Sequence, residues 1–263
     1  MSALAQKFET LRAKGEKALV LFVTAGDPPL SELPEILSAL AEGGADVIEV
    51  GIPFSDPFGE GPTIQASSQR ALDAGATPEA ILHAIRQSHV DVPMVTMGYY
   101  NPVLRFGLEK YAREGAAAGV SGTIISDLVP DEASAWSAAS AAAGLDTIFL
   151  VAPTSTDKRI REVAEGSTGF VYVVSRTGVT GSENAVPNDV TALVQRVRSL
   201  TDRPVCVGFG ISTPEHVEMV CQVADGAVVG SALVGKIHKE WNSGAGRAAI
   251  VEFVRELKEA TRG

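Results

Sequence analysis

The sequence predicts an α/β fold and, within that class, a single (β/α)8 barrel (a TIM barrel) with an extra N-terminal helix. Short apolar segments rich in β-branched residues recur along the whole chain, and helical patterns lie between them. Apolar runs of this length are typical of strands that are buried on both faces, as in a parallel sheet. The chain has 263 residues, which suits one barrel of about 250 residues. We therefore expect a single domain that covers residues 1–263.

The expected elements alternate from the first residues to the last. A helix at about Ala3–Lys14 precedes the first strand. Apolar segments then predict eight strands, at Ala18–Thr24, Asp46–Gly51, Pro93–Gly98, Gly122–Ser126, Thr147–Val151, Phe170–Ser175, Pro204–Gly208 and Ala227–Gly230. Apolar residues at helical spacing, or an acid or proline that opens a segment, predict helices at about 33–40, from near Pro62, and at Pro78–Ser88, Asp131–Ala143, Pro187–Leu200 and Arg247–Thr261.

The alternative architecture is a doubly wound open sheet. That fold typically has about six strands and places a glycine-rich phosphate loop after the first one. Here the first strand is followed by Ala25-Gly26-Asp27-Pro28, which is not a G-x-G-x-x-G segment. Eight alternating units without a linker or a break in composition therefore favour the barrel.

Composition and charge exclude several classes of protein. The net charge is −10 and the pI is about 4.9, so the chain lacks the basic footprint of a nucleic-acid-binding protein. No apolar segment reaches the about 18 residues of a membrane helix, and the first residues lack a signal-peptide core. We expect a soluble, cytoplasmic protein without a membrane or nucleic-acid partner. Cys206 and Cys221 lack metal-ligand spacing, and we expect both to be reduced packing residues.

The second predicted strand carries a carboxylate near its end. Val47 and Glu49 share one face of this strand, whereas Ile48 and Val50 share the other. If the two aliphatic side chains of the second face pack against the helices, Glu49 points into the barrel mouth. Catalytic groups of such barrels lie at this end of the strands. The other interpretation of Glu49 is a helix cap or an ion-pair partner.

The loop after Glu49 is rich in Pro, Gly and Asp and presents a second carboxylate at Glu60. Partial burial raises the pKa of a carboxyl into the range that is useful for proton transfer, so the pair suits acid–base chemistry on a small substrate. The other interpretation of Glu60 is a solvated loop acid. Gly59 and Gly61 flank it and permit unusual backbone angles, so the loop can adjust around this side chain.

Two further segments indicate a ligand site. The sixth predicted strand, which contains Tyr172, runs into a long loop that continues to about Pro187, and loops of this length in a barrel are often lids. The last two strands end in Gly208-Phe209-Gly210 and Gly230-Ser231, and each opens toward a helix. Such glycines let a phosphate approach the backbone at a helix N-terminus without any net positive charge. A core tyrosine and simple turn glycines are the alternatives.

These segments resemble, in the same order, the motifs of the tryptophan synthase α subunit family. The segment 48–65 is similar to the family signature, although the family normally has Asp, in D-G-P-T, where this chain has Glu60. The segment 172–181 follows the pattern Y-x-x-S-R-x-G-V-T-G of a mobile loop, and the segment 99–102 reads Y-Y-N-P. The resemblance covers nearly the whole chain. It implies a lyase that cleaves indole-3-glycerol phosphate to indole and glyceraldehyde 3-phosphate in tryptophan biosynthesis.

The resemblance also implies roles for individual residues. Glu49 would be the acid–base group, Glu60 would stabilise positive charge at the ring nitrogen, and Tyr172 would complete the catalytic set. Substrate-binding residues would be Phe22, Tyr100, Thr180, Gly181, Gly210, Gly230 and Ser231, the last four of them around the phosphate. Thr180 would hydrogen-bond Glu49 when the lid closes. On sequence alone, packing explains Phe22 about as well.

The family resemblance implies a partner but no cofactor. An α2β2 complex with the β subunit is expected, with Pro53, Asp56, Asn101 and Pro102 toward the partner or in communication with it. Pyridoxal phosphate belongs to that partner, so we expect no metal or organic cofactor here. We also expect Glu60 to change how much the activity of the chain depends on the β subunit.

Other functions remain open at this point. The chain can be a standalone indole-glycerol-phosphate lyase, or a catalytically silent α subunit that acts as an allosteric partner of the β subunit. Another phosphate-binding barrel enzyme, such as a sugar-phosphate isomerase or aldolase, is a further alternative. Schiff-base chemistry would need a lysine at a strand end, whereas the chain's lysines, such as Lys14, Lys110, Lys158 and Lys236, fall in predicted helices or loops. The four histidines lie on helices or helix ends, and we assign them no chemistry.

Overall fold

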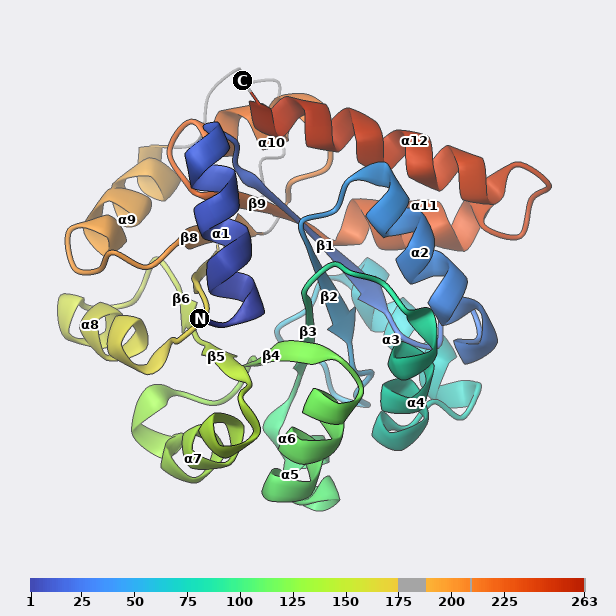
Figure 1. Cartoon of the computed structure of the whole chain (residues 1–263), viewed down its shortest axis with the longest axis horizontal. Coiled ribbons are helices and arrows are strands. Elements are labelled where there is room, and N and C mark those ends of the chain that lie inside the picture. Colours follow the sequence, from blue (N-terminus) through green and yellow to red (C-terminus); the bar gives the residue numbers. More distant parts are fainter. Residues whose placement is uncertain (175–187, 209, 263) are drawn as a thin grey trace.

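Parallel strands form a barrel that helices surround (Figure 1). The computed structural model describes residues 1–174, 188–208 and 210–262. In chain order the strands are β1 (Ala18–Thr24), β2 (Val47–Gly51), β3 (Met94–Gly98), β4 (Val120–Ile125), β5 (Asp146–Ile148), β6 (Leu150–Val151), β7 (Val171–Val174), β8 (Val205–Gly208) and β9 (Gly226–Val229). They lie side by side in the order β5-β4-β3-β2-β1-β9-β8-β7-β6. The predicted α/β barrel is confirmed.

The barrel closes through its fifth strand, which is interrupted at one residue. β5 and β6 are the two halves of the predicted strand Thr147–Val151, and Phe149 lies between them. The Phe149 carbonyl accepts a hydrogen bond from the Tyr172 N–H at 3.1 Å, so the interrupted strand still pairs with β7. The nine assigned strands therefore correspond to the eight that the sequence predicts.

The first predicted strand, Ala18–Thr24, has the observed bounds of β1, and the bounds of the others differ from the observed bounds by at most two residues where the structure describes them. β2 begins at Val47, because the Asp46 carboxylate accepts hydrogen bonds from the Leu19 N–H and the Lys258 Nζ, both at 2.9 Å, and closes the end of the strand. The predicted helix Asp131–Ala143 is divided into a 3-10 turn (η2, Pro130–Glu132) and the helix α7 (Ser134–Ala143). The structure describes nothing of Ser175.

Helices form the outer layer of the barrel (Figure 1). They are α1 (Ala3–Lys14), α2 (Leu33–Gly43), α3 (Pro62–Asp73), α4 (Pro78–Ser88), α5 (Tyr100–Phe106), α6 (Leu108–Ala117), α7 (Ser134–Ala143), α8 (Asp157–Gly166), α9 (Asn188–Arg198), α10 (Pro214–Cys221), α11 (Ser231–Glu240) and α12 (Gly246–Glu259). Two more 3-10 turns are η1 (Leu30–Glu32) and η3 (Ala260–Arg262). Proline at the first helical position and a threonine cap start α4 and α10, as the fixed φ of proline favours.

Strand parity divides the buried residues into two clusters. Ile48 and Val50 belong to the cluster between sheet and helices. Val47 belongs to the cluster inside the barrel, together with Phe22 of β1 and Met97 of β3. Because side chains alternate along a strand, Glu49 shares the interior with Val47, as the sequence predicts.

Helix α1 covers the N-terminal end of the barrel interior. Leu4 and Phe8 pack against the inner cluster, and the Phe8 and Phe170 ring centroids lie 5.8 Å apart. The helix approaches closely, because a Cβ at Gly122 or Gly169 would meet the Leu4 Cδ1 atom at 3.2 or 3.1 Å. Figure 1 shows α1 lying across this end of the strands. The interior is therefore filled at the end opposite the strand carboxyl termini.

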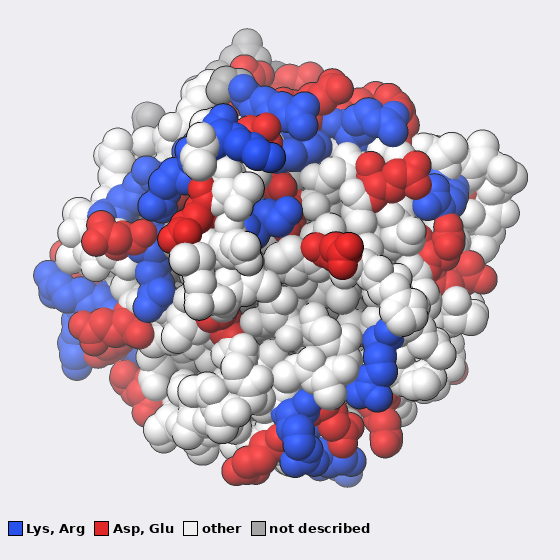
Figure 2. Space-filling view, viewed as in Figure 1, with Lys and Arg blue, Asp and Glu red and all other residues white. Residues whose placement is uncertain are grey.

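Basic and acidic side chains are mixed on the surface. Figure 2 shows Lys and Arg next to Asp and Glu on the face that α1 crosses. Arg247, for example, forms ion pairs with Glu35 and Glu42. Within the ranges that the structure describes, no helix combines the length and the apolar character needed to span a membrane. Cys206 and Cys221 are both buried and free.

Candidate active site

A cavity of about 270 Å³ opens at the carboxyl ends of the strands. Its wall includes residues from β1, β2, β3, β7 and β9, and from the loops that follow β2, β8 and β9. The lining residues are Phe22, Glu49, Glu60, Gly61, Ile64, Met97, Tyr172, Gly210, Ile211, Ser212, Val228, Gly230, Ser231 and Ala232. This is the end at which barrels of this fold place their active sites.

Glu49 lies at the bottom of this cavity with an unpaired carboxyl group. Its side chain is fully buried, and neither carboxyl oxygen has a hydrogen-bond partner among the described residues. Burial, reinforced by the nearby charge of Glu60, raises the pKa of Glu49 to about 8. At neutral pH this carboxyl therefore carries a proton that it can donate.

Glu60 reaches the same cavity from the loop between β2 and α3. Its N–H donates to the Pro57 carbonyl at 3.0 Å, and the Gln65 Nε2 donates to the Glu60 carbonyl at 2.8 Å. Burial raises the pKa of Glu60 to about 7, below that of Glu49. The environment thus separates the two carboxyls into a stronger and a weaker acid, which is the usual sign of divided acid–base roles.

Two aromatic side chains face these carboxyls, and each occupies space that a glycine leaves free. A Cβ at Gly208 would collide with the Tyr172 hydroxyl, and a Cβ at Gly51 would collide with the Phe22 ring. Burial, and then the charges of Glu49 and Glu60, raise the pKa of Tyr172 well above its usual range. Its hydroxyl is therefore a permanent hydrogen-bond donor in the cavity.

The other end of the cavity is built from backbone. Gly210 has a φ of 77°, a left-handed conformation that suits glycine, and Gly230 directly precedes α11. The first turn of a helix has N–H groups without intrahelical acceptors, and these groups favour an anion. No Lys or Arg lines the cavity within the described part of the chain. A phosphate at Ser231 would therefore be held by neutral donors and the helix dipole.

Most predicted site residues lie together in this cavity: Glu49, Glu60, Tyr172, Phe22, Gly210, Gly230 and Ser231. Tyr100 is not among the lining residues. It begins α5, its N–H donates to the Asp127 Oδ1 at 2.7 Å, and its ring packs against the outer cluster. Thr180 and Gly181 lie outside the described residues.

Of the apolar part of the wall, Phe22 was predicted from the sequence, whereas Ile64 and Met97 were not. Met97 and Val95 lie on the same face of β3, which points into the barrel. The alternation of side chains that predicts the position of Glu49 could therefore have predicted that of Met97. Ile64 lies in the first turn of α3, with its side chain toward the barrel interior. Ile64 and Met97 thus add to the apolar part of the cavity wall, next to Phe22 in the same lining.

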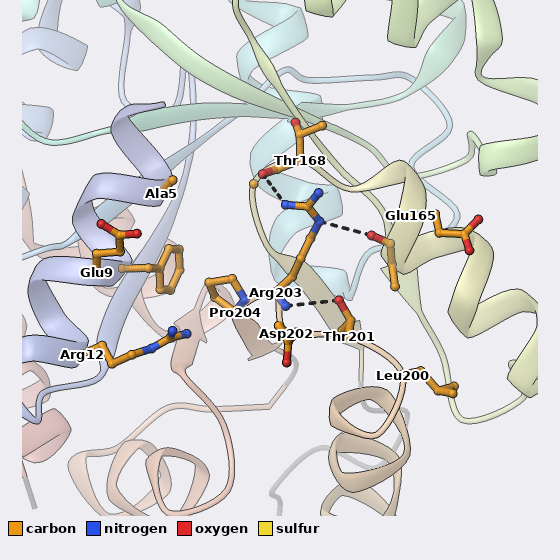
Figure 3. Close-up of a pocket in the computed structure, with 13 residues that line it drawn as sticks. Ala5, Glu9, Arg12, Glu165, Thr168, Leu200, Thr201, Asp202, Arg203 and Pro204 are labelled. Carbon is orange, nitrogen blue, oxygen red and sulfur yellow. Dashed lines mark hydrogen bonds between the residues drawn. The ribbon is translucent and has the colours of Figure 1, made fainter. Parts of the chain in front are cut away.

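A second, larger hollow of about 450 Å³ lies at the opposite end of the barrel (Figure 3). Here the Arg203 side chain donates to the carbonyls of Ala164 and Thr168, at 3.2 and 3.1 Å, and α1 contributes Glu9 and Arg12. Arg203 thereby connects the segment before β8 to the end of α8 and to the segment that precedes β7. This end of the fold serves stability rather than catalysis, so the smaller cavity is the candidate active site.

The fold and this cavity define the class: an α/β barrel with two buried carboxyls in a cavity at the carboxyl ends of its strands. The family model described as "Tryptophan synthase alpha chain" matches residues 8–262. The chain belongs to this family. It is a carbon–carbon lyase of tryptophan biosynthesis, and its reaction is the cleavage of indole-3-glycerol phosphate to indole and glyceraldehyde 3-phosphate.

Individual relatives agree over their full length. The tryptophan synthase alpha chain of Geobacter sulfurreducens is 48% identical and is aligned over 99% of either chain. Among solved structures, Mycobacterium tuberculosis tryptophan synthase has a TM-score of 0.92 at 40% identity, covering 100% of this chain and 99% of the other. The tryptophan synthase subunit alpha of Legionella pneumophila has a TM-score of 0.91 at 32% identity, covering 99% and 98%.

Proposed function

We propose that Glu49 transfers the protons in indole-3-glycerol phosphate cleavage and that Glu60 stabilises the positive charge that develops on the indole ring. The observation that carries this assignment is the fully buried, unpartnered carboxyl of Glu49, which faces the same small cavity as Glu60. An unsatisfied buried carboxyl is costly to the fold, so its retention is consistent with a use in chemistry.

Cleavage begins with a proton transfer from Glu49 to C3 of the indole ring. The new C3–H bond leaves positive charge at the ring nitrogen, and the Glu60 carboxylate stabilises that charge. The Glu49 carboxylate then accepts the proton of the hydroxyl on the adjacent side-chain carbon. The O–H electron pair becomes the carbonyl bond of glyceraldehyde 3-phosphate, and the pair of the broken carbon–carbon bond returns to the ring. Indole leaves, and Glu49 is protonated again.

The remaining lining residues orient the substrate for this reaction. The indole ring would lie among Phe22, Ile64 and Met97, and the phosphate would lie at the N-terminus of α11 near Gly230 and Ser231. The Tyr172 hydroxyl is positioned to donate a hydrogen bond to the reacting end of the substrate. No step in this scheme needs a metal or an organic cofactor.

Indole release by Glu49→Gln tests this assignment. The variant should lose at least about 1,000-fold in kcat, because the amide can neither donate nor accept the transferred proton. Asp146→Asn is a matched control, since Asp146 is also a buried acid with an oxygen that lacks a described partner, but it lies at the start of β5. Full activity in Glu49→Gln would contradict the assignment, and activity loss in both variants would indicate a folding defect.

We also propose that the chain acts in the cytoplasm as the α subunit of an α2β2 complex with a β subunit. Three large apolar side chains are exposed after the carboxyl ends of neighbouring strands: Phe58 at 70%, Leu104 at 52% and Val129 at 38%. They follow β2, β3 and β4 respectively. Exposed apolar side chains gathered at one end of a molecule favour a protein interface there. Pro53 and Asp56 belong to the loop after β2, and Asn101 and Pro102 lie in α5, which follows β3.

Glu60 gives this partner proposal a specific test. The family normally has Asp at this position, and a Glu extends the carboxylate by one methylene. The isolated chain and the Glu60→Asp variant should therefore differ in how strongly an added β subunit accelerates indole release. An identical acceleration would show that the longer side chain does not affect coupling to the partner. No acceleration of either protein would contradict the partner itself.

A further inference from the structure

The aromatic residue that follows β3 lies under the loop that carries Glu60. Tyr99 is 3% exposed, and its ring packs against two aromatic side chains of that loop. The ring centroids of Phe54 and Phe58 lie 5.1 and 5.3 Å from that of Tyr99, the first pair stacked and the second tilted. Both arrangements are favourable for aromatic pairs. Tyr99 therefore contacts the Glu60 loop at two separated positions.

A hydrogen bond adds a third point of attachment. The Tyr99 hydroxyl accepts a hydrogen bond from the Gly59 N–H at 3.1 Å. A Cβ at Gly59 would lie 3.3 Å from this hydroxyl, so the tyrosine contacts the loop backbone directly. Gly59 immediately precedes Glu60. The bond therefore fixes the peptide group from which the Glu60 side chain extends.

The loop needs such an attachment. Gly59 and Gly61 flank Glu60, and glycines allow many backbone conformations, so the chain itself does not define where the carboxylate lies. Other contacts of this segment are short-range: Phe58 N–H to the Asp56 carbonyl, Glu60 N–H to the Pro57 carbonyl, and the Gln65 side chain to the Glu60 carbonyl. Tyr99 is 40 positions away from Gly59 in sequence and connects the loop to the neighbouring strand.

We propose that Tyr99 is a positioning residue that holds the loop from Phe54 to Glu60 so that the Glu60 carboxylate stays in the active-site cavity. The inference rests on the role of Glu60 in the proposed function. Tyr99 is not among the residues that line the cavity of about 270 Å³. It lines a smaller adjoining hollow of about 10 Å³ that shares Glu60 and Met97 with the cavity, so we assign its action to the loop, through Gly59. Its phenol stays protonated, because burial raises its pKa to about 12.

Tyr99→Phe removes the hydrogen-bond acceptor and keeps the ring. We expect kcat for indole release to fall about tenfold, since misplacement of a catalytic group by about 1 Å can cost up to about 100-fold. KM should change less than about twofold, because Phe22 and the phosphate end of the cavity are untouched. Released into water, Glu60 should ionise at lower pH, so the acid limb of the pH–rate profile should move down from near pH 7. Glu49 and Tyr172, which face Glu60 from the strands, are unchanged in this variant.

Tyr111→Phe is the matched control. Tyr111 is also buried, and its hydroxyl donates to the Thr96 Oγ1 of β3 at 3.1 Å, on the outer side of the sheet. The control loses an equivalent buried hydrogen bond without touching the Glu60 loop. It should keep the wild-type kcat and acid limb. Amide exchange at Gly59, measured by NMR, should accelerate in Tyr99→Phe and stay at the wild-type rate in Tyr111→Phe.

The outcomes separate this inference from the proposed function. If Glu60→Gln is inactive while Tyr99→Phe keeps the wild-type kcat, acid limb and Gly59 exchange, the positioning role is wrong and the role of Glu60 stands. If Glu60→Gln retains full turnover, the role of Glu60 is wrong and the inference that rests on it is overturned as well. Equal loss of kcat in Tyr99→Phe and Tyr111→Phe would also overturn it, because a general loss of packing would then explain both.

Discussion

Between about pH 7 and about pH 8 the two carboxyls of the candidate active site differ in charge, although both are glutamates. Glu49 has no hydrogen-bond partner among the described residues and is fully buried, so its protonated form is favoured. Glu60 is partly exposed at the cavity wall and ionises first. The β2 strand and the loop that follows it therefore supply an acid and a carboxylate from one residue type.

This difference predicts a narrow optimum in the pH dependence of kcat/KM. Activity should rise as Glu60 ionises near pH 7, because only its carboxylate stabilises the ring cation, and fall as Glu49 loses its proton near pH 8. Initial rates of indole release from about pH 5.5 to about pH 9.5 measure both limbs. In Glu60→Gln the residual activity should lack the acid limb. An acid limb that persists in this variant would assign it to another group.

Burial of Glu49 also predicts that the free energy of unfolding falls as the pH rises. Burial raises the folded-state pKa of Glu49 to about 8 from its ordinary value of 4.5. Burial of Glu49 therefore does not penalise folding below pH 4.5, and stability is lost as the pH rises between 4.5 and about 8. Glu49→Gln removes the ionisable group. Its free energy of unfolding relative to wild type should therefore increase by about 1.4 kcal/mol per pH unit within this window. Urea denaturation at several pH values measures the difference, and a constant difference would contradict the burial effect.

At single positions, the sequence was informative where a regular period or a loop motif applies, as for Glu49 on β2 and for Glu60 and Gly230 in the loops. Alternation along β2 places Glu49 inside the barrel, and the structure agrees. Tyr99 is a different case. Because β3 ends at Gly98 and α5 begins at Tyr100, neither the period of the strand nor that of the helix applies to Tyr99. The contact of Tyr99 with a loop 40 positions away has no local signal in the sequence.

At the scale of the elements, a buried ion pair connects α12 to the residue that precedes β2 and stabilises the packing of this helix. The Lys258 Nζ lies 2.9 Å from the Asp46 Oδ2, with side-chain exposures of 9% and 7%. Glu16 and Lys7 extend the cluster to neighbouring segments. Breaking a buried pair leaves an uncompensated charge, which costs far more than the loss of an exposed pair.

Lys258→Met should therefore lower the free energy of unfolding by about 3 kcal/mol, because it leaves Asp46 buried without its main partner. The double variant Asp46→Asn/Lys258→Met should recover most of this loss. Lys158→Met, which removes a lysine 86% exposed and paired with Glu162, should leave stability almost unchanged. Chemical denaturation of the four proteins gives the comparison. Equal effects of Lys258→Met and Lys158→Met would contradict a special role of the buried pair.

Strands were easier to predict than helices for a physical reason. A strand buried on both faces is a continuous apolar run that stands out from its surroundings. A helix such as α8 buries only Ile160, Val163 and Ala164, and the sequence analysis gave no bounds for it. The short helices α5 and α6 also lacked predicted bounds, since their buried positions are few and are separated by Gly107.

On the scale of the whole molecule, catalysis and the proposed partner surface share one end of the barrel. Leu104→Asp should weaken association with a β subunit at least about tenfold, because a charge would be buried in an apolar contact. Indole release by the isolated variant should stay within about twofold of wild type, since Leu104 is not among the residues that line the cavity. Glu9→Lys, at the opposite end, is the control. Titration calorimetry measures association, and unchanged affinity of Leu104→Asp would move the interface elsewhere.

The position of α1 has a consequence for how the substrate enters the barrel and how the products leave it. Leu4 and Phe8 fill the interior at one end, so the cavity, as far as the described residues define it, opens at the carboxyl ends of the strands. The substrate and both products would therefore enter and leave at that end. The N-terminal helix thereby limits the route of the substrate and both products, although no residue of α1 is among those that line the cavity.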